Sequence, residues 1–441
     1  MAGPLSHAPD RSIVIAAGLR APQAKAGGQY AKETTPHLGA AVARELLLRT
    51  GVDPSEVDAV ICGCVGQPFD AANVGRVIAL RAGIGRDVPA HTTARNCASG
   101  MQAVTEAITQ ISAGVADLHL CVGVEVMSSY PLIMGEKLTQ MFASIFQSKT
   151  LGGRLAAIAK FRPSFLAPVV AITEGLTDPT CDYIMGKTAE QIARDFGISR
   201  VESDEYACQS HVRARDARER GRFDRELMPH MPLGAREGAR SLTTDDGIRD
   251  QQTVEALAKM RPYFEKPDGI VTIGNSCGIT DGATALLICT EEKAEELGLT
   301  PLARVLSYSW AGCDPRRMGL GPVFASAAAL KEADCRLSDV GVVELNEAFA
   351  SQVLACERAF SSKEFAKEHL GVGRAVGTLD LDRTNKNGGA IAIGHPVGAT
   401  GARLLLTAAH ELEESDEELA LATLCIGGGQ GGAVVLERMS T

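Results

Sequence analysis

The chain has 441 residues, a formal net charge of −10, 45% hydrophobic residues and only 4% aromatic residues. This length predicts about two to four domains, and the hydrophobic fraction excludes a disordered chain. The negative charge and the few aromatic residues argue against nucleic acid as a partner.

The twelve cysteines raise the question of the redox compartment. The N-terminal residues lack the basic stretch and apolar run of a signal peptide, and no apolar run reaches the roughly 18 residues of a membrane span. We therefore expect a cytoplasmic chain with reduced thiols. Cys62 and Cys64 are the only close pair, with no histidine cluster at metal-ligand spacing, so we expect no bound metal.

Short apolar runs alternate with helical patterns in the first part of the chain. The predicted strands are 12–16, 57–62 and 118–124, and the predicted helices are 38–50, 73–82 and 98–114. The run at 118–124 is almost entirely apolar, which indicates a strand buried on both faces. Alternating strands and helices predict an α/β fold with a mostly parallel sheet covered on both sides.

This alternation stops near residue 127 and returns near residue 264. The intervening segment is polar, with predicted helices at 188–196 and 203–221; strands are predicted again at 269–273 and 283–289. We expect three parts. They are a first half formed by 1–127 and 264–298, an inserted loop domain at 128–263, and a second half at 299–441.

The two halves resemble copies of one unit. The matching segments are 55–63 with 338–346, at an offset of 283, and 120–125 with 424–429, at an offset of 304. Cys97 and His395 each lie in a loop before a predicted helix, at an intermediate offset of 298. The duplication predicts that both residues occupy equivalent helix starts and point into one pocket. It also makes Cys121 the first-half counterpart of Cys425.

Cys97 is the candidate nucleophile. The free N–H groups and the positive dipole end of a helix favour a thiolate. The small residues Ala98, Ser99 and Gly100 after it allow a substrate to approach. The alternative is a buried structural cysteine, the commoner fate of this residue type.

His395 is the candidate base for Cys97. It lies among glycines, including Gly394 and Gly398, that let the backbone pass close to a ligand, and Pro396 suits a first helical turn. A neutral histidine can take a thiol proton. An isolated histidine is more often a capping or core residue, but its symmetry with Cys97 favours the catalytic interpretation.

Two further loops complete the candidate site. Cys425 precedes a glycine-rich loop that lacks the features of a dinucleotide-binding fingerprint and suits an oxyanion hole better. Asn346 follows an apolar strand, where ligands of open α/β sheets gather, and its amide can polarise a carbonyl or hold a water. Its alternative role is that of a turn former at a strand end.

Four motifs resemble those of the thiolase family, in that family's order and at comparable spacing. They are Asn96-Cys-Ala-Ser-Gly, Asn346-Glu-Ala-Phe, Gly394-His-Pro-Val-Gly-Ala-Thr-Gly and Cys425-Ile-Gly-Gly-Gly. The resemblance continues through 185–190, 203–206 and 274–283, and so covers nearly the whole chain.

The resemblance implies the thiolase fold: two similar α/β halves in five layers, α-β-α-β-α, with an inserted loop domain. It implies no permanently bound cofactor and coenzyme A as a substrate. Cys97 would attack a 3-ketoacyl-CoA with His395 as its base, and Cys425 would protonate the released acetyl-CoA enolate. His395 with a water on Asn346 would form one oxyanion site, and the N–H groups of Cys97 and Gly427 the other.

The same resemblance implies a set of substrate-binding residues. They are Met185, Ser276, Cys277, Gly278 and Phe349. Cys277 stands where many thiolases have a serine near the CoA pantetheine, and Ile184 where some short-chain members have a histidine. Both departures put the pantetheine contacts in question, not the chemistry.

Residues 137–165 predict a helix with one apolar face, and from 137 to 162 they contain five basic and no acidic residues. The segment resembles the loop domain of thiolase subunits in β-oxidation trifunctional complexes. That resemblance implies contact with a partner subunit or a membrane surface; the alternative is a helix covering the acyl pocket. Asn346 argues against the trifunctional type, because some of those subunits have a histidine there. At least a dimer, hence a homodimer or homotetramer, is expected from the family.

The leading hypothesis is a 3-ketoacyl-CoA thiolase of fatty-acid β-oxidation. An acetoacetyl-CoA thiolase working in the condensing direction is the alternative. A decarboxylating condensing enzyme would lack the second cysteine, so Cys425 argues against it. A non-catalytic acyl-CoA-binding protein would not need Cys97, His395 and Cys425 together.

Overall fold

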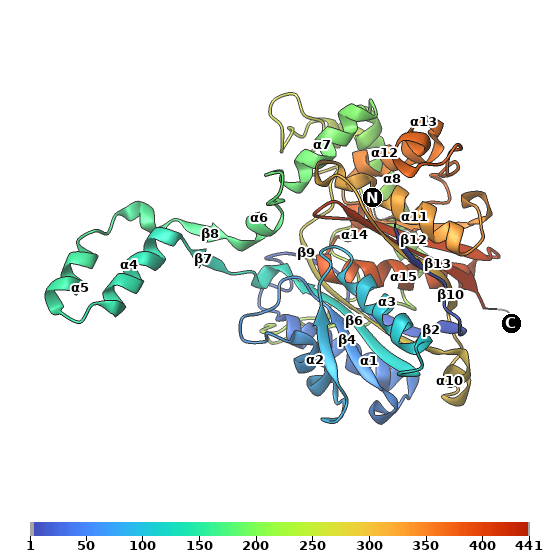
Figure 1. Ribbon diagram of the computed structural model, residues 1–441, viewed down its shortest axis with the longest axis horizontal. Helices are drawn as coiled ribbons and strands as arrows, with labels where there is room; N and C mark the ends of the chain where they lie inside the picture. Colours follow the sequence, from blue (N-terminus) through green and yellow to red (C-terminus); the bar gives the residue numbers. More distant parts are fainter. Residues whose placement is uncertain (1–3, 440–441) are drawn as a thin grey trace.

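The computed structural model describes residues 4–439. A layered body of sheet and helices carries a long arm that projects from one side of it (Figure 1). No helix among these residues is both long and apolar enough to cross a lipid bilayer.

The first half is a five-stranded sheet in the order β5-β4-β6-β9-β2. Its strands are β2 (Ile13–Arg20), β4 (Ala59–Gly63), β5 (Ala90–Thr93), β6 (Leu118–Val126) and β9 (Thr280–Thr290), and β3 (Ala24–Lys25) pairs with β9. β4 is parallel to β5 and β6, whereas β9 is antiparallel to β6 and β2. Every residue of β6 and β9 is buried, which explains their nearly continuous apolar sequence.

The second half repeats this arrangement in the order β11-β12-β13-β10. Its strands are β10 (Ala303–Gly312), β11 (Val342–Leu345), β12 (Leu419–Ile426) and β13 (Gln430–Arg438), and β1 (Leu5–His7) pairs with β10. β11 and β12 are parallel and the other pairs antiparallel, as for β4, β6, β9 and β2. β2 and β10 join the halves into one eleven-stranded sheet through two residue pairs.

Helices form three layers around the two halves of the sheet. The outer helices are α1 (Thr35–Thr50), α2 (Val74–Ala82) and α10 (Glu291–Glu296) on the first half, and α11 (Gly321–Glu332), α12 (Ala350–Ser361) and α13 (Lys363–Phe365) on the second. α3 (Ser99–Ser112) and α15 (Val397–Glu414) lie between the halves, and α14 (Ala390–Ile393) precedes α15. The predicted α/β fold of two similar halves in five layers is confirmed. The prediction of a mostly parallel sheet is wrong, because among the described strands of this sheet three pairs are parallel, β4 with β5, β4 with β6 and β11 with β12, and the others are antiparallel.

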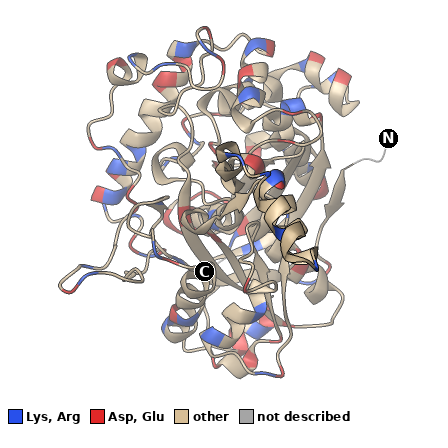
Figure 2. Cartoon of the chain, turned by 90° about the vertical axis from the view of Figure 1, so that its left-hand side faces the viewer, with Lys and Arg blue, Asp and Glu red and all other residues tan. Residues whose placement is uncertain are grey.

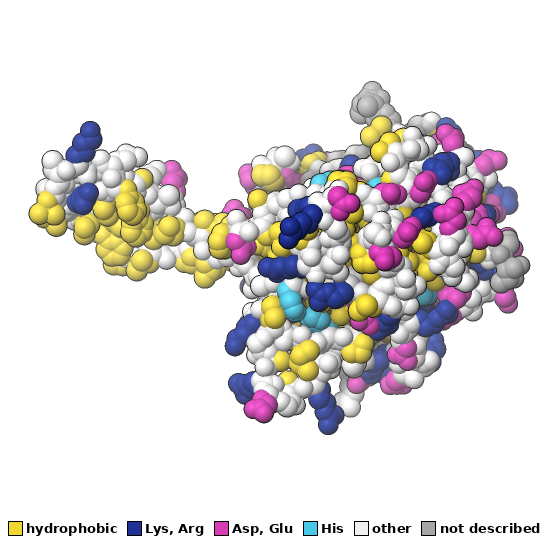
Figure 3. Space-filling view, turned by 90° about the horizontal axis from the view of Figure 1, so that it is seen from below, with side chains coloured by type: hydrophobic (Ala, Val, Ile, Leu, Met, Phe, Trp, Pro, Cys, Tyr) yellow, Lys and Arg dark blue, Asp and Glu magenta, His cyan; other side chains and the backbone are white. Residues whose placement is uncertain are grey.

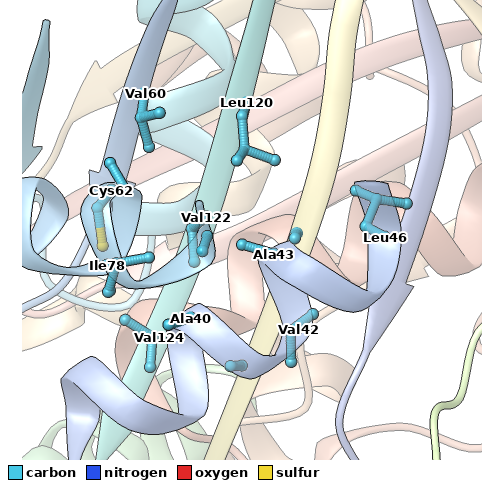
Figure 4. Packing of buried hydrophobic residues seen from close by; sticks show 14 of the residues in the cluster. Ala40, Val42, Ala43, Leu46, Val60, Cys62, Ile78, Leu120, Val122 and Val124 are labelled. Carbon is cyan, nitrogen blue, oxygen red and sulfur yellow. The ribbon is translucent and has the colours of Figure 1, made fainter. Parts of the chain in front are cut away.

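Buried apolar residues hold the layers together in three main clusters. In the outer cluster of the first half, Ala43 and Leu46 of α1 and Ile78 of α2 face Val60 of β4 and Leu120 of β6 (Figure 4). Each buried side chain of this size contributes about 1.5–3 kcal/mol to stability.

α3 and α15 cross in close contact at equivalent residues. Gly100 and Gly398 are related by the same offset of 298 as Cys97 and His395. A Cβ atom on Gly100 would lie 2.8 Å from the Gly398 carbonyl oxygen, so a side chain there would separate the helices. The crossing sets the two loops before the helices side by side at the centre of the molecule.

The segment between β6 and β9 forms a helical insertion and the arm. The insertion contains α6 (Ala171–Gly175), α7 (Met185–Asp195), α8 (Arg200–Glu219) and α9 (Val254–Ala258), and the arm contains β7 (Leu132–Met134), α4 (Glu136–Gln147), α5 (Leu151–Ile158) and β8 (Pro168–Val170). α8 begins with a capping box in which Ser199 and Glu202 satisfy each other's backbone N–H groups. Acidic and basic residues alternate along the elements of the body (Figure 2).

The strand predicted at 269–273 is wrong, since this segment has no strand pairing. The N–H groups of Ile270 and Val271 donate to the Glu190 carboxylate instead, at 3.0 and 2.9 Å. Thr272 donates its N–H to the Asn275 side chain at 2.8 Å. Side chains therefore satisfy the backbone groups that a neighbouring strand would otherwise bind.

The registers of the ladders also correct one inference about the cysteines. The offset of 283 between β4 and β11 matches Cys62 with Leu345. Cys62 lies opposite Val122 of β6, and Leu345 lies opposite Thr423 of β12. The strands β6 and β12 therefore align at an offset of 423 − 122 = 301. This register matches Cys425 with Val124, so the predicted match with Cys121 is wrong. The Cys121 thiol lies in the central core and donates to the Ala103 carbonyl at 3.4 Å.

Candidate active site

Cys97 lies in the tight loop that leads into α3. Asn96 has a left-handed φ of 43°, and the Ser99 hydroxyl accepts the Arg95 N–H at 2.9 Å and donates to the Asn96 carbonyl at 2.7 Å. The Asn96 side chain donates to the Gly427 carbonyl at 2.8 Å. These bonds attach the Cys97 loop to the glycine-rich loop after β12.

The Cys97 thiol is neutral at rest. Burial raises its pKa, and the nearby Gly427 N–H lowers it only in part. The sequence argument from the helix start predicted the opposite direction, because it omitted desolvation. A neutral thiol needs a base before it can attack.

His395 is buried and can serve as that base. Burial and the positive charge of Arg403 lower its pKa to about 3, so the imidazole is neutral at physiological pH. Its Nδ1 lies 2.6 Å from the Thr400 hydroxyl oxygen, and that hydroxyl donates to the Pro396 carbonyl at 3.4 Å. We assign the proton to Nδ1 on this bonding pattern, which leaves the Nε2 lone pair free to accept a proton.

Cys425, at the end of β12, is a second buried thiol. Burial raises its pKa well above the ordinary value, and the charges that Cys97 and Cys277 would carry raise it further. Cys97 likewise raises the pKa of Cys277, so the three sulfur atoms lie near one another. Cys425 keeps its proton at neutral pH, which suits an acid that protonates a carbanion.

Asn346 lies at the carboxyl end of β11, where its N–H donates to the Thr423 carbonyl at 3.0 Å. Its side chain is buried, yet neither amide atom bonds another residue of the described chain. Buried amides are normally hydrogen-bonded, so a water or a substrate oxygen is the partner that fits this one.

The residues predicted to bind substrate lie around these loops. Met185 and Phe349 pack with Cys425 in one apolar cluster, and the sulfur of Met185 would lie 3.3 Å from a Cβ on Gly427. Ser276 forms a β-bridge with Phe349. The remaining pair is joined to the site through the backbone: Cys277 donates its N–H to Ala348 at 3.0 Å, and Gly278 accepts the His395 N–H at 3.3 Å.

Two basic residues near the site were missed in the sequence. Lys25 and Arg249 line a small cavity together with Ser276, Gly278 and Gly394. They come from β3 and from the segment before α9, some 220 residues apart. No local pattern distinguishes them, since only the tertiary fold brings them to the cavity lined by Gly394, the residue before His395.

We expect Thr400→Val to lower kcat by roughly 10- to 100-fold, because valine cannot accept the Nδ1 proton and the base loses its fixed tautomer. KM is expected to change little. Steady-state kinetics and the melting temperature measure the effect. Thr139→Val, which removes an exposed hydroxyl from the arm helix α4, is the matched control. Unchanged kcat in Thr400→Val would contradict the assigned proton position.

The fold and the site together define an acyltransferase built from two α/β halves around a cysteine and a histidine at equivalent helix starts. The family model described as thiolase, N-terminal domain, matches residues 13–292, and that described as thiolase, C-terminal domain, matches residues 299–438. The chain belongs to the thiolase family.

Relatives with similar sequences match over nearly the full length. The mitochondrial trifunctional enzyme subunit beta of Bos taurus is 39% identical, over 97% of this chain and 88% of the relative. A 3-ketoacyl-CoA thiolase of Pectobacterium atrosepticum is 37% identical over 96% of both chains.

Solved structures show the same architecture. Human mitochondrial 3-ketoacyl-CoA thiolase in complex with CoA has a TM-score of 0.84 and 35% identity, covering 98% of this chain and 99% of that one. The acetyl-CoA acetyltransferase of Bacillus anthracis has a TM-score of 0.85 and 36% identity, covering 98% of this chain and 100% of that one.

Proposed function

We propose that the chain is a 3-ketoacyl-CoA thiolase of β-oxidation, which cleaves 3-ketoacyl-CoA with CoA to give acetyl-CoA and a shortened acyl-CoA. The observation that carries this proposal is the gathering of two neutral thiols, Cys97 and Cys425, with one neutral histidine. A nucleophile and a separate proton donor are the groups that reversible cleavage of a C–C bond requires.

In the first step, His395 Nε2 takes the Cys97 proton and the thiolate attacks the 3-keto carbon. The N–H groups of Cys97 and Gly427 hold the developing oxyanion, and removal of one such donor costs about 3 kcal/mol. The C2–C3 bond then breaks, leaving an acyl group on Cys97 and the enolate of acetyl-CoA. His395 and a water on Asn346 hold the enolate oxygen.

In the second step, Cys425 gives its proton to the enolate carbon and acetyl-CoA leaves. The thiol of a second CoA then attacks the acyl-cysteine and gives its proton to the Cys425 thiolate. The Cys97 thiolate leaves and recovers its proton from His395. No electron-sink cofactor takes part, since fixed hydrogen-bond donors stabilise the enolate.

Coenzyme A is the substrate that the basic residues support. Lys25 and Arg249 carry positive charge at the cavity beside Gly394, where the anionic phosphates of CoA would be attracted. Ser276 uses its hydroxyl internally, donating to the Thr272 carbonyl at 2.6 Å. Ser276 can therefore bind substrate only with its backbone groups or as an acceptor through its hydroxyl oxygen.

A series of 3-ketoacyl-CoA substrates of increasing chain length tests the function. We expect thiolysis with every length, a higher kcat/KM for a C10 substrate than for acetoacetyl-CoA, and a mass increase on the Cys97 peptide equal to the acyl group. A strong preference for acetoacetyl-CoA would favour the acetoacetyl-CoA thiolase instead. Absence of thiolysis with all lengths would refute both.

The arm is the surface that we propose for a β-oxidation partner subunit. Its helices α4 and α5 project from the body and do not pack over α3 or α15, the helices that follow the Cys97 and His395 loops (Figure 1). Only Leu138 of the apolar face predicted for α4 is buried, while Phe146 is 82% and Leu155 58% exposed. Figure 3 shows a continuous apolar surface on one side of the arm, and the arm contains further exposed apolar residues, among them Leu132, Phe142 and Ile158. Apolar surfaces of this kind mark interaction sites.

We expect the double substitution Phe146→Ser and Leu155→Ser to weaken assembly with a co-expressed β-oxidation partner subunit by at least about tenfold, because apolar anchors dominate such interfaces. Thiolysis by the isolated chain is expected to stay unchanged. Phe69→Ser, which removes an even more exposed phenylalanine from the body, is the matched control. Binding to lipid vesicles in place of the subunit would overturn the partner and favour a membrane surface.

A further inference from the structure

Glu125 is a buried carboxylate that the steps above do not use. It lies at the carboxyl end of β6, one residue beyond Val124, the first-half counterpart of Cys425. Its side chain is fully buried. A buried charge is costly unless hydrogen bonds compensate for it, so its partners reveal what it does.

Four N–H and O–H donors converge on the two Glu125 oxygens, and the Cys64 thiol is a fifth donor at 3.7 Å. The N–H groups of Val65, Gly66 and Gly398 donate at 3.1, 2.8 and 3.0 Å, and the Tyr130 hydroxyl donates at 2.9 Å. All of these partners are neutral. Burial raises the pKa of Glu125, and the hydrogen bonds from these donors lower it in part, so dipoles alone stabilise the charged carboxylate. A glutamine at position 125 would place its NH₂ group, itself a donor, opposite some of these donors. Those N–H or O–H groups would then lose their acceptor.

The donors come from three parts of the site. Val65 and Gly66 follow β4, and Tyr130 stands at the base of the arm. Gly398 is in the first turn of α15, directly after the His395 loop, where the helix dipole favours an anion. A Cβ atom at Gly398 would lie 2.7 Å from the carboxylate oxygen, so this contact between α15 and Glu125 leaves no room for a side chain at position 398.

We infer that Glu125 is a positioning residue of this active site: it fixes the first turn of α15, and with it His395, against the end of β6 and the loop after β4. The inference rests on the proposed roles of Cys97 and His395. A shift of about 1 Å in a reacting group costs roughly 100-fold in rate, so one displaced turn is enough to impair proton transfer.

The charge of Glu125 also acts on the nucleophile. The titratable groups facing it are Cys62 and Cys64 of the β4 segment, Tyr130 beyond β6, and Cys97 before α3; α15 offers a backbone N–H. The negative charge contributes to the raised pKa of Cys97. Glu125 thereby helps to keep the nucleophile protonated until His395 removes the proton.

Glu125→Gln is the variant that tests the inference, with two readouts. We expect kcat to fall roughly 10- to 100-fold with KM changed less than about threefold. We also expect the pH midpoint for alkylation of Cys97 by iodoacetamide, followed on the Cys97 peptide by mass spectrometry, to move down. Loss of the negative charge stabilises the thiolate and gives this sign.

Two further variants separate position from charge. Tyr130→Phe removes one donor and keeps the charge, so kcat should fall by less than in Glu125→Gln while the alkylation midpoint stays in place. Asp58→Asn changes a carboxylate that binds the N–H groups of Asp117 and Leu118 at the other end of β6, and should alter neither readout.

The outcomes distinguish this inference from the function itself. An unmoved alkylation midpoint or an unchanged kcat in Glu125→Gln would overturn the role of Glu125. If Glu125→Gln does not fold, full activity in Tyr130→Phe would also overturn the positioning role of Glu125. Alkylation needs no thiolase substrate, so the midpoint can be read even if the proposed reaction is wrong.

Discussion

Cys97→Ala is expected to lower kcat for thiolysis by at least about 10⁴-fold, because the acyl group loses its only covalent acceptor. The acyl-enzyme mass on the peptide that contains residue 97 should disappear. Binding of CoA should persist, since the basic residues at the cavity, Lys25 and Arg249, are untouched. Steady-state kinetics measure the loss of turnover, peptide mass spectrometry the loss of the acyl-enzyme, and calorimetric titration the binding of CoA.

Cys335→Ala is the matched control for this change. Its thiol is also partly exposed, but it packs against the outer cluster of the second half, away from the site. Full activity in Cys335→Ala with none in Cys97→Ala assigns the loss to the nucleophile and not to cysteine content. Retained activity in Cys97→Ala would refute the covalent mechanism.

The layered fold could be predicted because its evidence is local and repeated. Fully buried strands such as β6 and β9 appear as apolar runs, and the helices between them have their own periodicity. The duplication added what local patterns lack. It placed Cys97 and His395 at equivalent helix starts, and the crossing of α3 and α15 at Gly100 and Gly398 has the same offset.

The errors share a cause, which is that tertiary contacts outweigh local patterns. Residues 269–273 are apolar enough for a strand, but Glu190 and Asn275 bind their N–H groups. The helix that begins just after Cys97 suggested a lowered pKa for this thiol, and burial reverses the direction. An apolar helical face fits a covered core as well as an exposed arm, so α4 could not be assigned from its sequence.

Other features of the site have no local signal at all. Glu125 lies near the end of an apolar strand, and nothing in the sequence indicates that donors from three other segments meet it. Lys25 and Arg249 are ordinary surface-type residues until the fold brings them to one cavity. A single sequence contains such residues without marking them, because what distinguishes them is their neighbours.

Cys425→Ala is expected to lower kcat for thiolysis by about 10³-fold, within the range for loss of a general acid. Its effect should differ in kind from that of Cys97→Ala. The enolate can still form, but its protonation must rely on water in a buried site. Exchange of the acetyl-CoA methyl protons with deuterated solvent, followed by NMR, should therefore stop.

Reactions that need only Cys97 should survive in Cys425→Ala. Transfer of an acyl group from a simple acyl-CoA to Cys97 breaks no C–C bond, so the acyl-enzyme mass should still appear. Because the charge of one thiol raises the pKa of the other, removing Cys425 should leave the Cys97 alkylation midpoint unchanged or slightly lower. If methyl-proton exchange continues at the rate of the unmodified enzyme, Cys425 is not the proton donor, and the separate roles assigned to the two thiols fail.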